Sequence, residues 1–324
     1  MPTTRVLWNF LSTDSLSSKI SLMSNPQLVE FQTSDKLNLP GLFYEPFRKT
    51  DKAALYLHGN GSSSVFYDVT IMNFLGSELN LHQIAFLPFN NRGANYITKL
   101  RVDDEHKKWI KIGTTYELIR DCIYDIDAAV SFLKSRNYRE FYLIGHSTGA
   151  NKICVYNYYK PQNSISKYIL LGGGDDTGIY YKQLGPRKFR LALQKAKQEI
   201  QKGNGGKLVP KYLVDYLFSY QSLYDTLNPD GDYNIFPFLE SLEKIKLSKK
   251  PLFREYKSIT KPTLVIYGSD DEYCYGKVSE IIETLGKMSS APGKFKLQII
   301  NDCDHGFDGK EGELVDIITR WLSA

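Results

Sequence analysis

Residues 141–149 read Phe-Tyr-Leu-Ile-Gly-His-Ser-Thr-Gly, and this stretch decides the fold. The four apolar residues at its start predict a buried strand, and the residues from Ala150 onward are compatible with a helix. Gly145 and Gly149 carry no Cβ, so the backbone can turn sharply between the two elements and pass close to itself. A sharp strand-to-helix turn with Ser147 at its centre is typical of a nucleophile elbow, which lifts a serine hydroxyl above the end of a sheet.

Three further motifs occur along the chain on either side of this turn. His58-Gly59-Asn60-Gly61 precedes it, and Gly268-Ser269-Asp270-Asp271 and then Asp304-His305-Gly306-Phe307 follow it. With these motifs the chain resembles the α/β-hydrolase superfamily over residues 27–174 and 258–324, where nucleophile, acid and histidine come in this order. The resemblance implies an α/β-hydrolase fold, with a mostly parallel sheet, helices on both faces and an inserted cap.

The length and composition of the chain are those of an ordinary globular protein. With 324 residues it is long for one minimal domain, so we expect one domain with an insertion. Its formal net charge of +5 is far from the clustered basic face of a nucleic-acid-binding protein, so no nucleic-acid partner is expected. No run approaches the roughly 18 apolar residues of a membrane span, and residues 1–11 lack the apolar core of a secretory signal. We therefore expect a cytoplasmic protein.

The cysteines do not form a metal-binding or disulfide pattern. A zinc site or a disulfide framework needs cysteines at close, regular spacings. Here they are scattered at Cys122, Cys154, Cys274 and Cys303. We expect four reduced thiols, and we expect neither a metal ion nor an organic cofactor.

Apolar patterning divides the chain into an N-terminal arm (1–26), a core (27–174 and 258–324) and a cap insertion (175–257). The arm is rich in Ser, Thr and Asn and is expected to be loosely attached. Strands are expected at 28–31, 42–44, 53–57, 84–87, 140–145, 167–171, 263–267 and 295–300, and helices from 148, near 277–288 and from 311. This alternation predicts a mostly parallel sheet covered on both faces, with two antiparallel strands at one edge.

One more helix is predicted to begin at Thr114. Thr114 and Glu117 fit a capping box, in which the two side chains bind the first free N–H groups of a helix. The apolar residues that follow have helical spacing and share one face: Ile119, Cys122, Ile123, Ile126, Val130 and Leu133.

The cap is expected above the ends of the strands, where ligands of open α/β sheets bind. It contains a helix with an apolar side and a glycine-rich turn at 203–206. Its Lys and Arg residues are interleaved with Gln and Glu, so we expect a solvated face rather than a site for an acidic substrate. Its aromatic residues are candidates for a substrate pocket or for the core of the cap itself: Tyr216, Phe218, Tyr220 and Phe236.

Ser147 is the candidate nucleophile, and it needs a base. His305 follows the apolar strand near 295–300 in a short polar loop, from which it can reach the elbow. An acid must orient this histidine, and the family pattern points to Asp271, three residues after Gly268. Neighbouring carboxylates stay open as alternatives: Asp270, Asp175 and Asp176.

The resemblance also implies an oxyanion hole made of two backbone N–H groups. One belongs to Thr148 at the start of the elbow helix, and the other to Asn60 in the loop after the first of the flanking motifs. The turn at 90–93, Asn-Asn-Arg-Gly, resembles the Arg-Gly turn of these hydrolases and is interpreted as structural.

These residues predict a serine hydrolase that cleaves a carboxylic ester or thioester of a small molecule through an acyl-enzyme on Ser147. A second and weaker resemblance, carried by the elbow with residues 149–152 and by the turn at 90–93, is to cytosolic hydrolases that include fungal siderophore esterases. The alternative from another class is a non-hydrolytic member of the fold, either a lyase or a small-ligand receptor. The presence of a candidate for every catalytic role favours the hydrolase.

Overall fold

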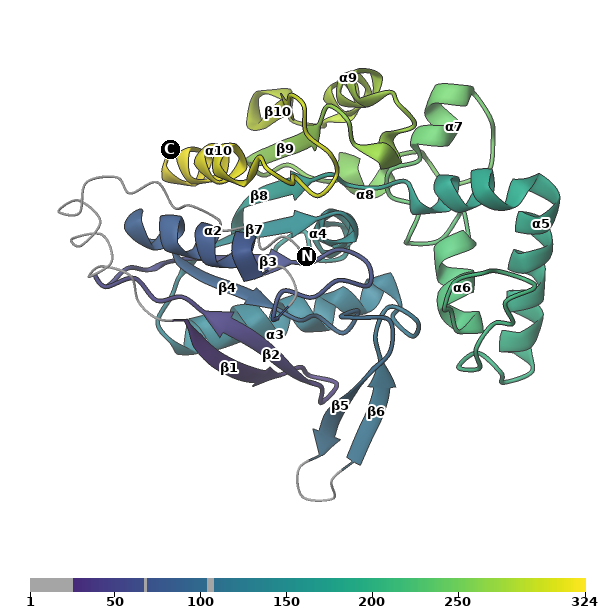
Figure 1. Cartoon of the computed structure of the whole chain (residues 1–324), viewed down its shortest axis with the longest axis horizontal. Helices are drawn as coiled ribbons and strands as arrows, with labels where there is room; N and C mark the ends of the chain where they lie inside the picture. Colours follow the sequence, from purple (N-terminus) through teal and green to yellow (C-terminus); the bar gives the residue numbers. More distant parts are fainter. Residues whose placement is uncertain (1–25, 67–68, 104–107) are drawn as a thin grey trace, which may run out of the picture.

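The computed structural model describes residues 26–66, 69–103 and 108–324 (Figure 1). All but the last residue of the predicted arm at 1–26 lies outside the described residues. An eight-stranded sheet forms the centre, in the order β1-β2-β4-β3-β7-β8-β9-β10. Its strands are β1 (Gln27–Gln32), β2 (Asn38–Phe43), β3 (Lys52–Leu57), β4 (Ala85–Phe89), β7 (Glu140–His146), β8 (Ile165–Leu171), β9 (Thr263–Gly268) and β10 (Phe295–Ile300).

The sheet is mostly parallel, as the resemblance implies. Each neighbouring pair of strands from β4 to β10 is parallel. β1 and β2 are antiparallel to each other, and Gly41 of β2 pairs in antiparallel fashion with Phe89 of β4. The predicted parallel sheet and its antiparallel edge are both confirmed.

Helices cover both faces of the sheet (Figure 1). α2 (Val69–Leu81) and α10 (Glu311–Ser323) share one hydrophobic core with the sheet. α3 (Cys122–Ser135), α4 (Thr148–Tyr159) and α9 (Val278–Met288) share the other. Since successive side chains of a strand point to opposite faces, each central strand contributes to both cores.

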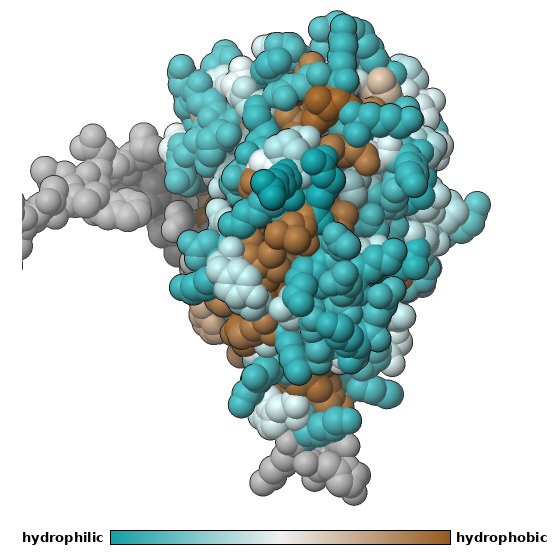
Figure 2. Space-filling view, turned by 90° about the vertical axis from the view of Figure 1, so that its right-hand side faces the viewer, coloured by the Kyte–Doolittle hydropathy of each residue, from teal (hydrophilic) through white to brown (hydrophobic). Residues whose placement is uncertain are grey.

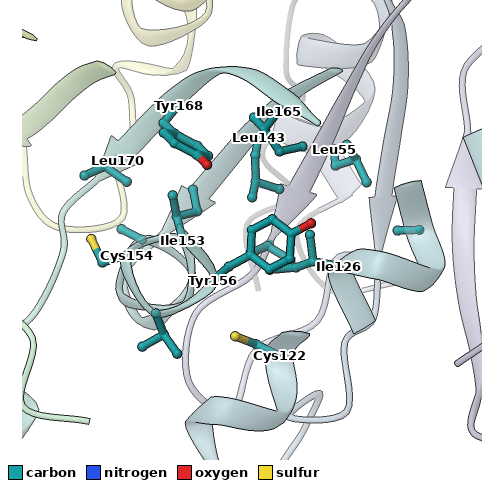
Figure 3. Packing of buried hydrophobic residues seen from close by; sticks show 14 of the residues in the cluster. Leu55, Cys122, Ile126, Leu143, Ile153, Cys154, Tyr156, Ile165, Tyr168 and Leu170 are labelled. Carbon is teal, nitrogen blue, oxygen red and sulfur yellow. The ribbon is translucent and has the colours of Figure 1, made fainter. Parts of the chain in front are cut away.

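The central strands illustrate this alternation. Tyr56 of β3 belongs to the core under α2 and α10, whereas its neighbour Leu55 belongs to the opposite core. Figure 3 shows the second core, in which Leu143 of β7 lies close to Ile153 and Tyr156 of α4. Burial of each such large side chain contributes roughly 1.5–3 kcal/mol to the stability of the fold.

The prediction of a capping box at Thr114 and Glu117 is wrong. The helix begins with a 3-10 turn (Ile119–Asp121) that runs into α3 at Cys122. Thr114 donates a hydrogen bond to the side chain of Asn60, and Glu117 is buried in an ion pair. The two side chains that the local sequence assigns to the helix start therefore contact distant residues and do not cap the helix.

A hairpin of β5 (Thr98–Asp103) and β6 (Lys108–Ile112) also went unpredicted. It projects from the rest of the molecule (Figure 1). Its sequence alternates basic and apolar residues over only a few positions, which is a weak strand signal on its own.

The segment inserted between β8 and β9 consists of helices joined by long loops. It contains α5 (Asp176–Gln201), α6 (Tyr220–Leu227), α7 (Phe238–Glu243) and α8 (Arg254–Lys257). α5 is kinked where Gly185 takes a φ of 73° directly before Pro186. Figure 2 views the molecule from this side, which is mostly hydrophilic with separate hydrophobic patches.

The inserted segment packs in two parts. The buried apolar residues of 180–227 form a core of their own, and α5 and α6 extend away from the sheet (Figure 1). The buried aromatic residues of 233–256 and Ile235 instead belong to the sheet core under α3, α4 and α9. There the ring of Phe238 lies 6.5 Å from that of Tyr267 in β9. Phe236, a candidate pocket residue from the sequence, is buried in this sheet core.

Two buried ion pairs lie beside the elbow helix α4. Arg92, in the loop after β4, places Nη2 2.8 Å from Oδ1 of Asp125 in α3. Lys152 of α4 places Nζ 2.6 Å from Oε1 of Glu117 and donates to Oδ1 of Asn91 at 2.9 Å. Burial raises the pKa of Glu117, while the charge of Lys152 acts in the opposite direction. The pairs join α3, α4 and the loop after β4 beneath the elbow.

Lys152→Met is expected to lower the free energy of unfolding by roughly 3–5 kcal/mol, because it leaves the carboxylate of Glu117 buried without its counter-charge. Urea denaturation followed by circular dichroism measures this loss. The double variant Lys152→Met/Glu117→Gln should recover part of it, since replacing both partners of a buried pair costs less than removing one.

Lys160→Met in the same region is the matched control. Lys160 pairs with Asp127 at the surface, where the two side chains are 42% and 39% exposed. Such pairs contribute about 0–1 kcal/mol. Equal losses of stability in Lys160→Met and Lys152→Met would contradict the role assigned to the buried pair.

Candidate active site

Ser147 stands at the turn between β7 and α4 with a φ of 55° and a ψ of −125°. Its N–H donates to the carbonyl oxygen of Leu171, the last residue of β8, at 2.8 Å. A positive φ at a residue other than glycine costs of order 1–3 kcal/mol and persists only where the surroundings hold it. This strained strand-to-helix turn has the geometry of a nucleophile elbow.

Glycines make room for the turn. A Cβ on Gly149 would lie 2.2 Å from the carbonyl oxygen of Leu57, and a Cβ on Gly145 would lie 2.4 Å from the carbonyl carbon of Gly149. A Cβ on Gly59 would lie 2.9 Å from that of Ser147. No larger residue fits at these distances, so the loop after β3 is held directly against the serine.

His305 lies in the loop between β10 and α10, and its ring is bound to Asp271. Its Nδ1 is 2.9 Å from Oδ2 of Asp271, and both side chains are almost fully buried. Asp271 follows β9, and its Oδ1 also accepts the N–H of Tyr273 at 3.0 Å. The contact leaves Nε2 as the ring nitrogen that faces away from the carboxylate. His305 and Ser147 border the same cavity.

The loop that carries His305 is held from several sides. Nε2 of His146 lies 2.8 Å from the carbonyl oxygen of His305, and the two rings are 4.9 Å apart. Tyr273 packs edge-on at 4.6 Å, and Glu272 accepts the N–H of His305 at 3.2 Å. Gly172, with a φ of 54°, lies under the ring, where a Cβ would come within 3.1 Å of Nδ1. Any side chain at 172 would push the histidine away.

The alternative carboxylates lie elsewhere. Asp270 is exposed beside Asp271. Asp175 caps α5 and accepts the N–H of Leu239 at 2.7 Å, and burial raises its pKa to about 7. Asp176 borders the cavity, but the described hydrogen bonds to the histidine ring come from Asp271. Among these carboxylates, Asp271 is the one placed to orient His305.

The other histidines have different surroundings. Burial lowers the pKa of His58 to about 3 and that of His146 to about 4, so both rings are neutral near pH 7. Nδ1 of His82 lies 3.1 Å from Oγ of Ser323, far from the elbow along the last helix. His106 lies outside the described residues.

The two predicted oxyanion residues flank the serine. Thr148 is the first residue of α4, so its N–H is one of those that a helix leaves without an acceptor of its own. Asn60 follows Gly59 and borders the cavity together with Ser147. Its side chain accepts a hydrogen bond from Thr114, which ties the loop after β3 to the loop after β6.

The serine and the histidine open onto a cavity of about 660 Å³. One part of its wall comes from the apolar core under α2 and α10, and comprises Tyr56, Ile71, Leu75, Leu171, Leu314, Val315 and Ile318. Another part comes from the loops after β3, β4 and β6 and from the inserted segment, and comprises Asn60, Tyr96, Thr114, Asp176, Tyr180, Tyr216, Leu217 and Phe218. A molecule bound at Ser147 can therefore contact an apolar wall and an aromatic, polar wall.

Many of the residues that line this cavity were not predicted from the sequence. Leu75 and Ile318 have the spacing of ordinary core positions, and nothing local distinguishes a core residue from a cavity wall. Tyr96 lies in a loop and Tyr273 in a three-residue 3-10 helix (Glu272–Cys274), and neither stands in a repeating pattern. Gly172 could have been identified from the sequence as a position with a special backbone role, because it begins the run Gly-Gly-Gly at the end of a strand.

Within the described ranges, no group of three or more His, Cys, Asp and Glu side chains is placed to hold a metal ion. None of the helices in that part of the chain is long and apolar enough to cross a membrane. The four cysteines are buried and unpaired with one another. Burial raises the pKa of the Cys303 thiol to about 11, and the thiol is protonated near pH 7.

Solved structures with this architecture include esterases and hydrolases. The esterase Pf2001 of Pyrococcus furiosus is 18% identical, with a TM-score of 0.54 over 99% of this chain and 98% of its own. Est1E of Butyrivibrio proteoclasticus, solved with ferulic acid bound, is 16% identical, with a TM-score of 0.54 over 91% and 98%. The α/β-hydrolase GrgF of Penicillium sp. sh18 is 18% identical, with a TM-score of 0.59 over 92% and 97%. At these identities the likeness is one of fold.

A sequence family described as "Protein of unknown function (DUF1749)" matches residues 108–323, which is about two thirds of the chain. The matched region contains the elbow, Asp271 and His305. No curated protein matches the sequence. The chain belongs to this family, and its fold is that of the α/β-hydrolases.

Proposed function

We propose that the protein is a serine hydrolase that cleaves a carboxylic ester or thioester of a small molecule through an acyl-enzyme on Ser147. The observation that carries the proposal is the 2.9 Å contact between Asp271 and Nδ1 of His305, beside a cavity that the strained serine also borders. A carboxylate at Nδ1 favours the histidine tautomer whose lone pair is on Nε2, and this nitrogen can then accept the serine proton.

The proposed reaction has two halves. Nε2 of His305 takes the proton of Ser147 while Oγ attacks the carbonyl carbon, and the tetrahedral intermediate collapses when the histidine returns the proton to the leaving alcohol or thiol. Water then attacks the acyl-enzyme and gives a proton to the same histidine, which returns a proton to Oγ of Ser147 as the acid leaves. Asp271 stabilises the imidazolium in both halves. The reaction needs neither a metal ion nor an organic cofactor.

The backbone N–H groups of Thr148 and Asn60 are the proposed oxyanion donors. Thr148 follows the nucleophile at the start of a helix, where its N–H has no acceptor within the helix. The loop of Asn60 is held against Ser147 by the close approach of Gly59. Preorganised donors of this kind typically contribute about 3–4 kcal/mol each to the stabilisation of the transition state.

The acyl group is proposed to occupy the apolar wall under α2 and α10. Apart from Tyr56 this wall is made of aliphatic side chains, and its charged neighbours Asp308 and Glu311 lie at the start of α10. An apolar chain gains about 0.8 kcal/mol for each methylene buried there. That Pf2001 and Est1E are described as esterases agrees with ester hydrolysis on this fold.

Ser147→Ala is expected to fold like the wild type and to lose roughly three to six orders of magnitude in turnover of p-nitrophenyl esters. A fluorophosphonate probe should label the wild type and leave the variant unlabelled. Wild-type turnover by the folded variant would end the hydrolase proposal. Identification of the products separates a hydrolase, which yields acid and alcohol, from a lyase that uses the same residues.

Asp271→Asn is expected to lower turnover by about four orders of magnitude, because the amide favours the wrong histidine tautomer. Asp270→Asn is the matched control, since it makes the same chemical change at an exposed neighbour. Its turnover should stay within about threefold of the wild type. A collapse in Asp270→Asn with Asp271→Asn nearly unaffected would move the acid by one residue.

Ile71→Trp is expected to lower kcat/KM for p-nitrophenyl decanoate relative to the acetate by about tenfold, because the larger ring fills the apolar wall. Phe74→Trp is the control. It introduces the same side chain on the same helix at a position that is 40% exposed and outside the cavity wall. An unchanged chain-length preference in Ile71→Trp would place the acyl group elsewhere.

A further inference from the structure

The wall of the cavity under the inserted segment is aromatic and carries one carboxylate. Four tyrosines and a phenylalanine contribute to it: Tyr96, Tyr180, Tyr216, Tyr273 and Phe218. The carboxylate is that of Asp176, at the first position of α5. The other part of the wall, under α2 and α10, is largely aliphatic, so the two parts suit different chemical groups.

The aromatic rings form one group around the carboxylate. The rings of Tyr180 and Tyr216 meet edge-to-face at 5.5 Å, as do those of Tyr180 and Phe218. Burial raises the pKa of Tyr180, and the neighbouring Asp176 and Tyr273 act in the same direction. Tyr180 is almost fully buried, whereas Tyr216 is 50% exposed and Tyr273 46% exposed, which sets these two at the entrance.

Asp176 has no Lys or Arg paired with it among the described residues. Its carboxylate accepts a long hydrogen bond, 3.4 Å from Nδ2 of Asn151, and a second one from its own backbone N–H at the start of α5. The positive groups that act on it are His305 and Lys152, and Lys152 is already paired with Glu117 at 2.6 Å. Burial raises the pKa of Asp176 to about 6, so the group is mainly ionised at pH 8.

Positive side chains are missing from the described wall of the cavity. Its titratable residues are tyrosines, His146, His305 and the carboxylates of Asp176, Asp308 and Glu311, with no Lys or Arg among them. Recognition of phosphate groups relies on Arg, Lys or helix N-terminal N–H groups. A carboxylate among aromatic rings favours a positively charged ligand, because the carboxylate is negative and so is the face of an aromatic ring.

We propose that this part of the cavity, formed by Asp176 and the surrounding tyrosines, is a binding site for an ammonium group on the alcohol side of the ester. The inference rests on the proposed function, since it places the acyl group under α2 and α10 and the alcohol under the inserted segment. It distinguishes among the substrates that the chemistry allows: cationic esters are favoured over neutral ones, and acyl-CoA thioesters, with their phosphates, are disfavoured.

The test compares two substrates that differ only in charge. Butyrylcholine and 3,3-dimethylbutyl butyrate have the same shape, because a trimethylammonium group replaces a tert-butyl group. At about pH 8 the wild type is expected to hydrolyse the choline ester with a kcat/KM about tenfold higher than that of the neutral ester. This preference is of the size expected when an ammonium group is attracted by aromatic rings and a carboxylate in a partly desolvated site. Asp176→Asn should reduce this ratio to about one or two.

Asp302→Asn is the matched control, because it removes the same charge from an exposed position outside the cavity wall. It should keep the wild-type ratio. Tyr216→Leu is a second probe at an exposed position, and it should lower the ratio about threefold, whereas Tyr216→Phe keeps the ring face and should keep the ratio. These variants test the site even if Asp176→Asn does not fold.

A wild-type ratio below two, with the neutral ester readily hydrolysed, would overturn the ammonium site and leave the hydrolase intact. An equal fall in Asp302→Asn and Asp176→Asn would also overturn it, since the effect would then be a general one of net charge. Failure of the proposed function has a different signature: neither ester is hydrolysed, and Ser147 does not react with a fluorophosphonate.

Discussion

The close passage of backbone segments at the elbow is the constraint on which the site depends. Gly149 lies so near the carbonyl of Leu57 that a larger residue would separate α4 from β3, and Gly59 lies almost as near to Ser147. The N–H of Ser147 is bound in turn to Leu171 at the end of β8. Displacing the serine would therefore require the ends of three central strands to move together. This support offsets the strain of the positive φ at the turn and fixes the hydroxyl to the sheet.

The candidate base is placed by the same kind of contact at the neighbouring strands. A Cβ on Gly268 would lie 2.3 Å from the carbonyl oxygen of Cys303, so the loop after β10 crosses directly over the end of β9. Since β9 and β10 are paired in parallel, the residues just beyond both strands meet at one edge of the sheet. Asp271 and His305 come together there, and Gly172 leaves space for the ring.

The inserted segment combines an anchored part with a projecting part. Residues 233–256 are packed into the sheet core, whereas 180–227 have a core of their own and contribute Tyr180, Tyr216 and Phe218 to the aromatic wall of the cavity. Asp175 joins the two, because its carboxylate caps α5 and also accepts the N–H of Leu239 and the hydroxyl of Tyr275. The aromatic wall is thus tied to the same sheet that carries the serine and the histidine.

The eight strands of the central sheet, the helices α3, α4, α9 and α10 and the turn at 141–149 follow from the sequence alone, because apolar periodicity and the small size of glycine act between residues close in the chain. The helix α2 and the β5–β6 hairpin do not. The sequence narrowed the acid to a few carboxylates, but only the tertiary structure shows that Asp271 contacts the histidine. It also misplaced the start of α3, since Glu117 pairs with Lys152 rather than capping a helix. The residues that line the cavity could not be predicted from the sequence either. Ile71 and Asp176 border a cavity because of the way distant segments pack around them, and the local sequence contains no information about that packing.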